Sequence, residues 1–127
     1  MQAFARNFDH PDDETRFPNG QERIIDVLGT TVGLATFQPG WRWSNDVRPM
    51  MGSDSCPLLH VGYALSGRLH VEVNDGSTLD LASGDVFKIP PGHDAWVVGD
   101  DPFVLLDWGG KVREYAKPVD ELIGGSR

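Results

Sequence analysis

The chain has 127 residues and a mass of 14.0 kDa, a length typical of one domain. Its net charge of −8 argues against nucleic acid and anionic membranes as partners. One cysteine, Cys56, excludes an internal disulfide. The longest apolar runs are too short to cross a bilayer, and the first 13 residues resemble no secretory signal, so we expect a cytoplasmic protein without a membrane partner.

The first half of the chain mixes polar segments with two strand candidates. Residues 1–20 are polar and acidic, which predicts an extended N-terminal arm with little structure of its own. Residues 24–28 and 30–37 are expected strands, because β-branched residues are frequent there. Residues 41–57 lack alternation, so we predict a long irregular connection with at most a short strand over residues 41–43.

From residue 58 onward, short apolar runs alternate with turn residues. Leu69, Val71 and Val73 alternate with polar residues, a pattern typical of a half-buried strand. Strands are predicted at 58–65, 69–73, 77–81, 86–89, 95–98 and 103–108. Eight or nine short strands predict an all-β sandwich or barrel over residues 21–110. Residues 111–127 are expected to be a C-terminal tail that could include a short helix.

Two segments together resemble the cupin superfamily. The first runs from Pro39-Gly40-Trp41 through His60 to Gly67, and the second is the segment 84–93, in which a glycine and five further residues precede Pro-x-Gly. The similarity covers about residues 37–108. It implies a double-stranded β-helix, or jelly-roll barrel, an architecture that hides strand edges. The resemblance also implies a homodimer.

The resemblance further implies a divalent metal inside the barrel. In cupins, two histidines and a glutamate of the first motif and one histidine of the second hold the metal. Gly67 matches the glycine that closes the first motif, which puts His60 at the position of the glutamate. The paired histidines would fall in the stretch that holds Asp54 and Cys56. A histidine, His93, stands two residues before the position expected in the second motif. The chain thus departs from the pattern at every ligand position but carries ligand-type residues nearby.

Strand parity gives independent support for a site near His60. Side chains two apart share a face, so Gly62 and Ala64 lie beside His60, and their small size predicts either a pocket or a bulky neighbour that fills the space. Thiolate and imidazole together favour a divalent transition metal, zinc before iron or manganese. Each candidate ligand also has a structural alternative: a hydrogen-bonded His60, a core Cys56, a solvated His93 and a turn-capping Asp54.

Aromatic and cationic residues near the motifs suggest how an organic ligand would be held. Trp41, Trp43 and Trp96 could line the rim of a pocket by burial and stacking, or could serve only as core or dimer surface. Arg42 is a candidate anchor for a carboxylate, and Met50 for an adaptable lid.

The leading hypothesis is a small metal-binding cupin that holds one metal near Cys56, His60 and His93 and binds a small organic molecule beside it. The sequence leaves open whether it catalyses a metal-assisted lyase, isomerase or oxygenase reaction. The alternative hypothesis is a non-catalytic binding or sensing module without a functional metal. A structural dimer that acts through partner contacts is a third.

Overall fold

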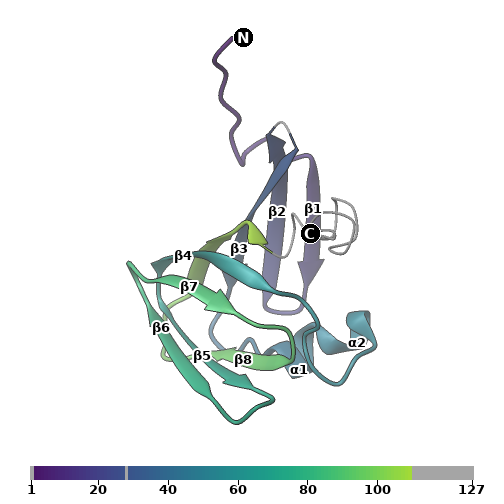
Figure 1. The fold of residues 1–127 in the computed structure, drawn as a ribbon, viewed down its shortest axis with the longest axis vertical. Helices are drawn as coiled ribbons and strands as arrows, with labels where there is room; N and C mark the ends of the chain where they lie inside the picture. Colours follow the sequence, from purple (N-terminus) through teal and green to yellow (C-terminus); the bar gives the residue numbers. More distant parts are fainter. Residues whose placement is uncertain (1, 28, 110–127) are drawn as a thin grey trace, which may run out of the picture.

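The fold was analysed in a computed structural model, which describes residues 2–27 and 29–109. The described residues form nine strands and two single-turn helices (Figure 1). The strands are β1 (Asp13–Phe17), β2 (Gly20–Val27), β3 (Thr30–Phe37), β4 (His60–Ser66), β5 (Arg68–Val73), β6 (Thr78–Ala82), β7 (Val86–Ile89), β8 (His93–Val97) and β9 (Phe103–Asp107).

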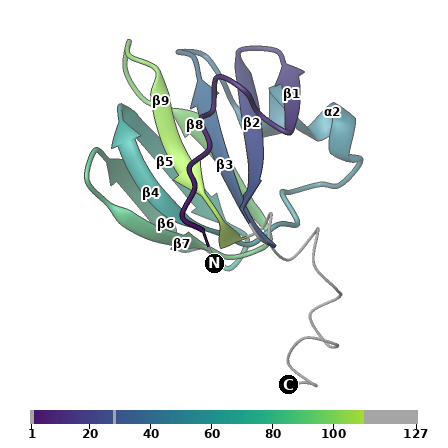
Figure 2. The ribbon, with the colours of Figure 1, turned by 90° about the horizontal axis from the view of Figure 1, so that it is seen from above.

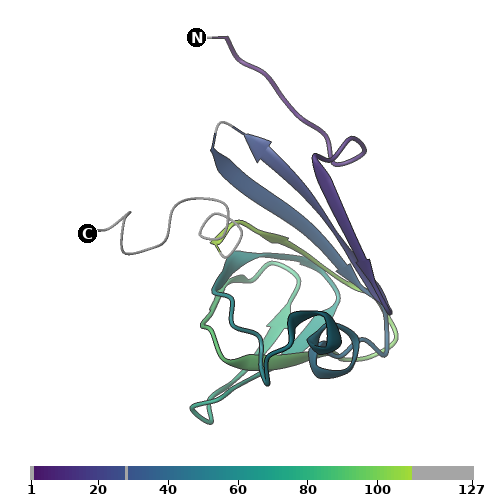
Figure 3. The ribbon, with the colours of Figure 1, turned by 90° about the vertical axis from the view of Figure 1, so that its right-hand side faces the viewer.

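The strands form two antiparallel sheets that enclose one core. The larger sheet has the order β1-β2-β3-β9-β4-β7, and the smaller sheet has the order β6-β5-β8. Figures 1 and 3 show the smaller sheet facing the β4 end of the larger one, while β2 and β3 extend beyond the rest of the barrel. The non-consecutive neighbours β3-β9, β9-β4, β4-β7 and β5-β8 mark the crossovers of the chain. The prediction of an all-β fold is confirmed.

Apolar side chains at alternate strand positions of both sheets form the core. Val71 of β5 and Phe103 of β9 are completely buried, and each lies at an alternate position of its strand. The buried cluster between the sheets includes Ala64, Leu69, Leu81, Phe87, Ala95, Val97 and Leu105. Residues two apart therefore face the same interior, as period-two patterning requires.

The small residues beside His60 mark close packing, not a pocket. A Cβ on Gly62 would collide with the backbone oxygen of Leu106, and it would lie 2.9 Å from Cζ of Phe87. Ala64 has no exposed surface. Of the two expectations for these positions, a pocket or a bulky neighbour that fills the space, the bulky neighbour applies. β9 and Phe87 occupy the space that larger side chains at Gly62 and Ala64 would need.

The segment expected to be an N-terminal arm contains a strand that the sequence analysis did not predict. β1 pairs with β2 over five residues, from Asp13↔Ile24 to Phe17↔Gly20. Asn19, at the hairpin turn, has φ of +63°, a left-handed conformation that Asn tolerates. β1 is an edge strand, which explains its polar composition: Glu14 pairs with Arg23 of β2, so charged side chains cover the exposed edge.

The long connection between β3 and β4 contains helices α1 (Trp43–Asp46) and α2 (Arg48–Met51). The expected short strand is reduced to one bridge between Arg42 and Trp96 of β8. Buried Asp46 accepts a hydrogen bond from the backbone N–H of Arg42, and Asp94 of β8 accepts one from Ser44, so side chains replace strand pairing in this segment.

Neither helix among the described residues is long and apolar enough to span a membrane. The predicted C-terminal tail, with its short helix, lies outside the described residues. Figure 2 shows the barrel from above, and Figures 1 and 3 show the N-terminal segment before β1 leading away from it.

Candidate metal-binding site

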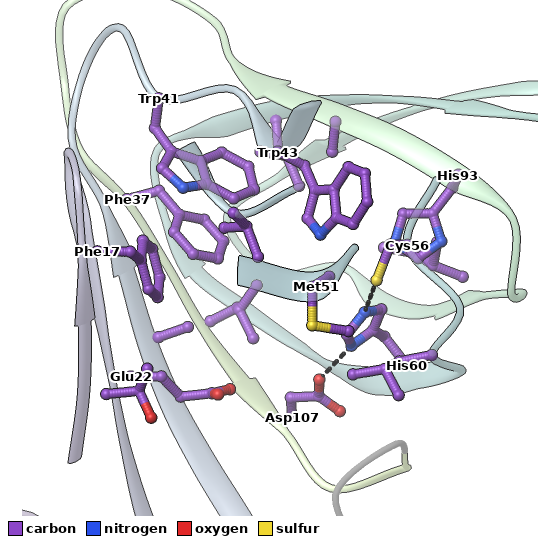
Figure 4. A pocket seen from close by; sticks show the side chains of 18 of the residues that line it. Phe17, Glu22, Phe37, Trp41, Trp43, Met51, Cys56, His60, His93 and Asp107 are labelled. Carbon is purple, nitrogen blue, oxygen red and sulfur yellow. Dashed lines mark hydrogen bonds and ion pairs between the residues drawn. The ribbon is translucent and has the colours of Figure 1, made fainter. Parts of the chain in front are cut away.

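A cavity of about 250 Å³ lies inside the barrel, and residues from both sheets and from the connection between β3 and β4 line it (Figure 4). Most of its wall is apolar. The polar side chains gather at Cys56, His60, His93 and Asp107, with Glu22 and Thr15 farther along the wall. The apolar lining consists of Phe17, Ile24, Ala35, Phe37, Trp41, Trp43, Val47, Met50, Met51, Leu58, Leu69, Phe87, Ile89, Ala95 and Leu105.

Backbone pairing brings the cysteine and the two histidines together. The N–H of Cys56 donates to the carbonyl of His93 at 2.8 Å, and the N–H of Gly92 donates to the carbonyl of Cys56 at 2.7 Å. This isolated bridge holds Cys56 beside the start of β8. His60, the first residue of β4, enters from the other sheet, where it pairs with Ile89 of β7.

The three side chains converge on one point. Their candidate ligand atoms all lie within 4.8 Å of one another. The Cys56 Sγ lies 3.5 Å from Nε2 of His60, and the two imidazole rings meet edge to face with centroids 5.1 Å apart. Cys56 and His93 are buried. Zinc bonds to sulfur and nitrogen are about 2.0–2.3 Å long, so two ligand atoms of one zinc ion lie at most about 4.6 Å apart. The distances among the three candidate ligand atoms, up to 4.8 Å, are close to this limit.

Both imidazoles are held by their Nδ1 atoms. Nδ1 of His60 lies 2.5 Å from Oδ2 of Asp107, and Nδ1 of His93 lies 2.8 Å from the carbonyl of Pro90. Each acceptor fixes the proton on Nδ1 of its partner, which leaves Nε2 as the atom that can bind a metal. A carboxylate or carbonyl behind each histidine is the usual support of a metal-binding imidazole. The donor set therefore fits a transition metal.

The same contacts set the ionisation of the cysteine and His60. Burial opposes ionisation of the Cys56 thiol, but hydrogen bonds and charge from His60 and His93 outweigh it and lower the pKa of Cys56 to about 6. Burial also opposes protonation of His60, but Asp107 and Cys56 outweigh it and raise the pKa of His60 to about 9. Without a metal, the site therefore favours a thiolate beside an imidazolium at neutral pH.

Comparisons with known proteins identify the fold. No protein-family model matches the chain, and no curated protein matches it significantly. Solved structures do match. A cupin-like protein from Thermotoga maritima matches with a TM-score of 0.53 and 20% identity, over 89% of this chain and 84% of its own. This protein has a cupin fold.

Two further structures match this chain with similar scores. KdgF from Halomonas sp. has a TM-score of 0.57 and 22% identity, over 87% of this chain and 94% of its own. Oxalate decarboxylase from Lactobacillus farciminis, in complex with formate, has a TM-score of 0.58 and 24% identity over 77% of this chain. This chain spans only 30% of that enzyme's length. At these identities the likenesses establish the fold alone.

The structure places the other predicted site residues in two groups. Trp41, Trp43 and Met50 line the cavity. Asp54 does not join the metal cluster: its side chain is fully exposed and lies 3.5 Å from Arg48. We therefore leave Asp54 out of the proposed ligand set, which is Cys56, His60 and His93.

Trp96 and Arg42 lie outside the cavity. Trp96 alternates with the cavity-lining His93 and Ala95 along β8, so its ring is on the outer face of the sheet. The Arg42 guanidinium lies 4.3 Å above that ring and pairs with Asp94 at 3.2 Å. The two side chains engage each other in this cation–π contact, and neither is placed to anchor a ligand in the cavity.

Sequence analysis missed two acidic residues of the site. Asp107 is 2% exposed and follows Phe103 and Leu105 on the inner face of β9, where a carboxylate interrupts an apolar pattern. That interruption was the available signal, because a buried carboxylate needs a partner. Glu22 lies on β2, and its alternation with the buried Ile24 gave a weaker signal.

Proposed function

We propose that this cupin holds one divalent transition metal ion with Cys56, His60 and His93 and binds a small organic molecule in the adjoining cavity. The observation that carries the proposal is the orientation of the two imidazoles: Asp107 and the Pro90 carbonyl occupy both Nδ1 atoms, which leaves both Nε2 atoms for the ion. One sulfur and two nitrogens suit zinc first, with iron and manganese as the alternatives.

Three protein ligands leave a coordination position for water or a ligand oxygen. When bound, the ion would act as a Lewis acid that polarises this oxygen. The chain's own residues prepare the site. Asp107 keeps the proton on Nδ1 of His60, and the apolar wall limits access of water to the cluster. Binding requires His60 to release its Nε2 proton, so metal affinity is expected to rise with pH.

Elemental analysis of the purified full chain tests the proposal. We expect one zinc, iron or manganese ion per chain after expression in medium supplemented with these metals, and one-to-one binding of zinc when metal-free protein is titrated. A crystal with anomalous scattering at the metal edge would place the ion. Metal-free protein that also fails to bind added zinc, iron(II) or manganese(II) would contradict the proposal and favour the binding module without a metal.

A second candidate function rests on the order Cys56–His60–Asp107. The sulfur lies beside Nε2 of the imidazole, and the carboxylate holds Nδ1. This is the order of nucleophile, base and orienting acid in cysteine-dependent acyl transfer. The pair would already be ionised in the metal-free protein, because the pKa of Cys56 is lowered to about 6. Such chemistry and a bound metal exclude each other, since both use the sulfur.

Alkylation of Cys56 measures the ion pair directly. In metal-free protein, the rate of reaction with iodoacetamide is expected to rise through a midpoint near pH 6, because the pKa of the thiol is about 6. Asp107→Asn removes the charge that raises the pKa of His60, so the midpoint is expected to move up toward the ordinary thiol value of about 8.5.

Zinc supplies the control for this measurement. If the sulfur is a ligand, stoichiometric zinc suppresses alkylation across the whole pH range. Asp80→Asn is the matched variant, because Asp80 accepts a hydrogen bond from His70 on the outer face of the smaller sheet. It should leave the Cys56 profile unchanged. A midpoint above pH 8 in the unmodified sequence would contradict the ion pair.

A further inference from the structure

We propose that the organic ligand of this cavity is a small monoanion with a flat apolar body. Its one anionic oxygen group would lie at the metal, and its ring or similarly planar body would lie among the aromatic side chains at the other end of the cavity. The inference rests on the proposed function, because the ion is the anchor of the anionic group.

Aromatic rings form one end of the cavity. Phe37 and Trp41 stack with ring centroids 3.8 Å apart and planes 9° from parallel, and the centroid of the Phe17 ring lies 6.1 Å from that of Phe37. Figure 4 shows these three rings on the side of the cavity away from Cys56, with Trp43 between the two ends. Flat walls of this kind favour a planar, apolar body by burial and stacking.

The other end of the cavity favours an anion once the metal is bound. A divalent ion carries two positive charges, and the Cys56 thiolate cancels only one of them, since metal-binding imidazoles are neutral. The Asp107 carboxylate contacts Nδ1 of His60, so it lies behind the imidazole and not on the Nε2 side that would face the ion. The coordination position that three protein ligands leave open therefore suits an anionic oxygen.

The part of the wall that the structure describes offers the ligand no basic side chain as a second anchor. Within residues 2–27 and 29–109, no arginine or lysine lines the cavity. Arg42, the expected anchor for a carboxylate, has its guanidinium over Trp96 and 3.2 Å from Asp94, outside the cavity. A second anionic group would be buried without an opposite charge, which is costly. The single negative charge of the ligand therefore belongs at the metal.

The volume limits the size of the ligand. An apolar cavity of about 150 Å³ is known to take up benzene. The present cavity has about 250 Å³, which leaves room for one ring with a short substituent. Met50 and Met51 are the exposed residues of its lining, so the entrance lies along α2. Flexible thioether side chains at an entrance adapt to the outline of the molecule that passes.

Three probes separate the role of the body from that of the charge: benzoate, acetate and benzyl alcohol. Each is titrated by calorimetry into the full chain loaded with zinc. Benzoate is expected to bind at least about tenfold more tightly than acetate, which lacks the ring, and than benzyl alcohol, which lacks the charge. In metal-free protein, benzoate should bind at least about tenfold more weakly than in zinc-loaded protein.

A fourth and a fifth probe test the number of charges. 4-Nitrobenzoate and terephthalate have nearly the same size and shape, but the second carboxylate of terephthalate replaces an uncharged nitro group. In zinc-loaded protein, terephthalate is expected to bind at least about tenfold more weakly than 4-nitrobenzoate, because its second charge meets no arginine or lysine in the described part of the wall.

Phe17→Leu tests the aromatic end of the cavity. The variant keeps an apolar side chain but removes the ring, and it is expected to weaken benzoate about threefold or more while acetate, which is too short to reach this end, is unaffected. Phe4→Leu is the matched control, because Phe4 is 54% exposed and does not line the cavity. It should leave the affinities for all probes unaltered.

The outcomes separate this inference from the metal proposal. If zinc binds one-to-one but acetate or benzyl alcohol binds as tightly as benzoate, the ligand class is overturned and the metal site stands. The same holds if terephthalate equals 4-nitrobenzoate, if Phe17→Leu leaves benzoate unchanged, or if benzoate binds equally with and without zinc. Failure of zinc itself to bind, seen before any organic probe is added, contradicts the proposed function and overturns this inference with it.

Discussion

Cys56→Ser and His93→Ala are each expected to weaken zinc binding by more than about a hundredfold. Loss of a group that merely supports a metal ligand costs about 10–100-fold in affinity, and loss of the ligand itself costs more. Each variant leaves only two of the three candidate ligands that lie within 4.8 Å of one another. Competition with a coloured chelator, followed on the metal-free protein, measures the change.

Asp54→Asn is the matched control for these variants. It removes a potential ligand from the same segment of the chain, but the Asp54 side chain is fully exposed and faces Arg48. Zinc affinity should therefore stay within about twofold of the unmodified sequence. A hundredfold loss in Asp54→Asn, or retention of affinity in Cys56→Ser with the fold intact by circular dichroism, would show that the ion is held elsewhere.

Phe103→Ala is expected to lower the free energy of unfolding by about 3–5 kcal/mol, the usual cost of removing a buried phenylalanine. Phe103 starts β9 and pairs with Phe37 at the end of β3, and its side chain has no exposed surface. The loss combines reduced apolar burial with the cavity left behind. Urea unfolding, followed by circular dichroism, gives the free energy from the shift of the midpoint.

Phe4→Ala is the companion variant, because it makes the same chemical change at a side chain that is 54% exposed. It should alter the free energy of unfolding by no more than about 0.5 kcal/mol. Phe103 does not line the cavity, so any Phe103→Ala protein that remains folded should still bind zinc one-to-one. Equal effects of the two variants on stability would contradict the placement of Phe103 in the core.

The strands could be predicted where alternation or β-branching was strong. The predictions for residues 30–37 and 86–89 match β3 and β7, and the other six predicted strands differ only at their ends. β1 was missed because an edge strand needs little apolar surface. The dipeptide Asn19-Gly20 was nevertheless a hairpin signal, and the structure uses it as a turn between β1 and β2.

The site was harder to predict because it depends on register across strands distant in the sequence. The cupin resemblance grouped Cys56 with His60, but nothing local indicated that Asp107, forty-seven residues after His60, would hold Nδ1 of that histidine. Trp96 shows the reverse case. Its position after the second motif suggested a pocket residue, whereas the alternation with His93 along β8 already assigned it to the outer face.

The connection between β3 and β4 supplies several residues of the cavity wall. Trp41, Trp43, Met50, Met51 and Cys56 all come from this single stretch, and it is fastened to β8 by backbone bonds at Trp41 and Cys56. Exchanging this stretch for another of similar length would change the shape of the cavity and replace one of the three candidate ligands in one step, while every strand-to-strand ladder stayed as it is. The barrel would then serve as a fixed frame for new specificities.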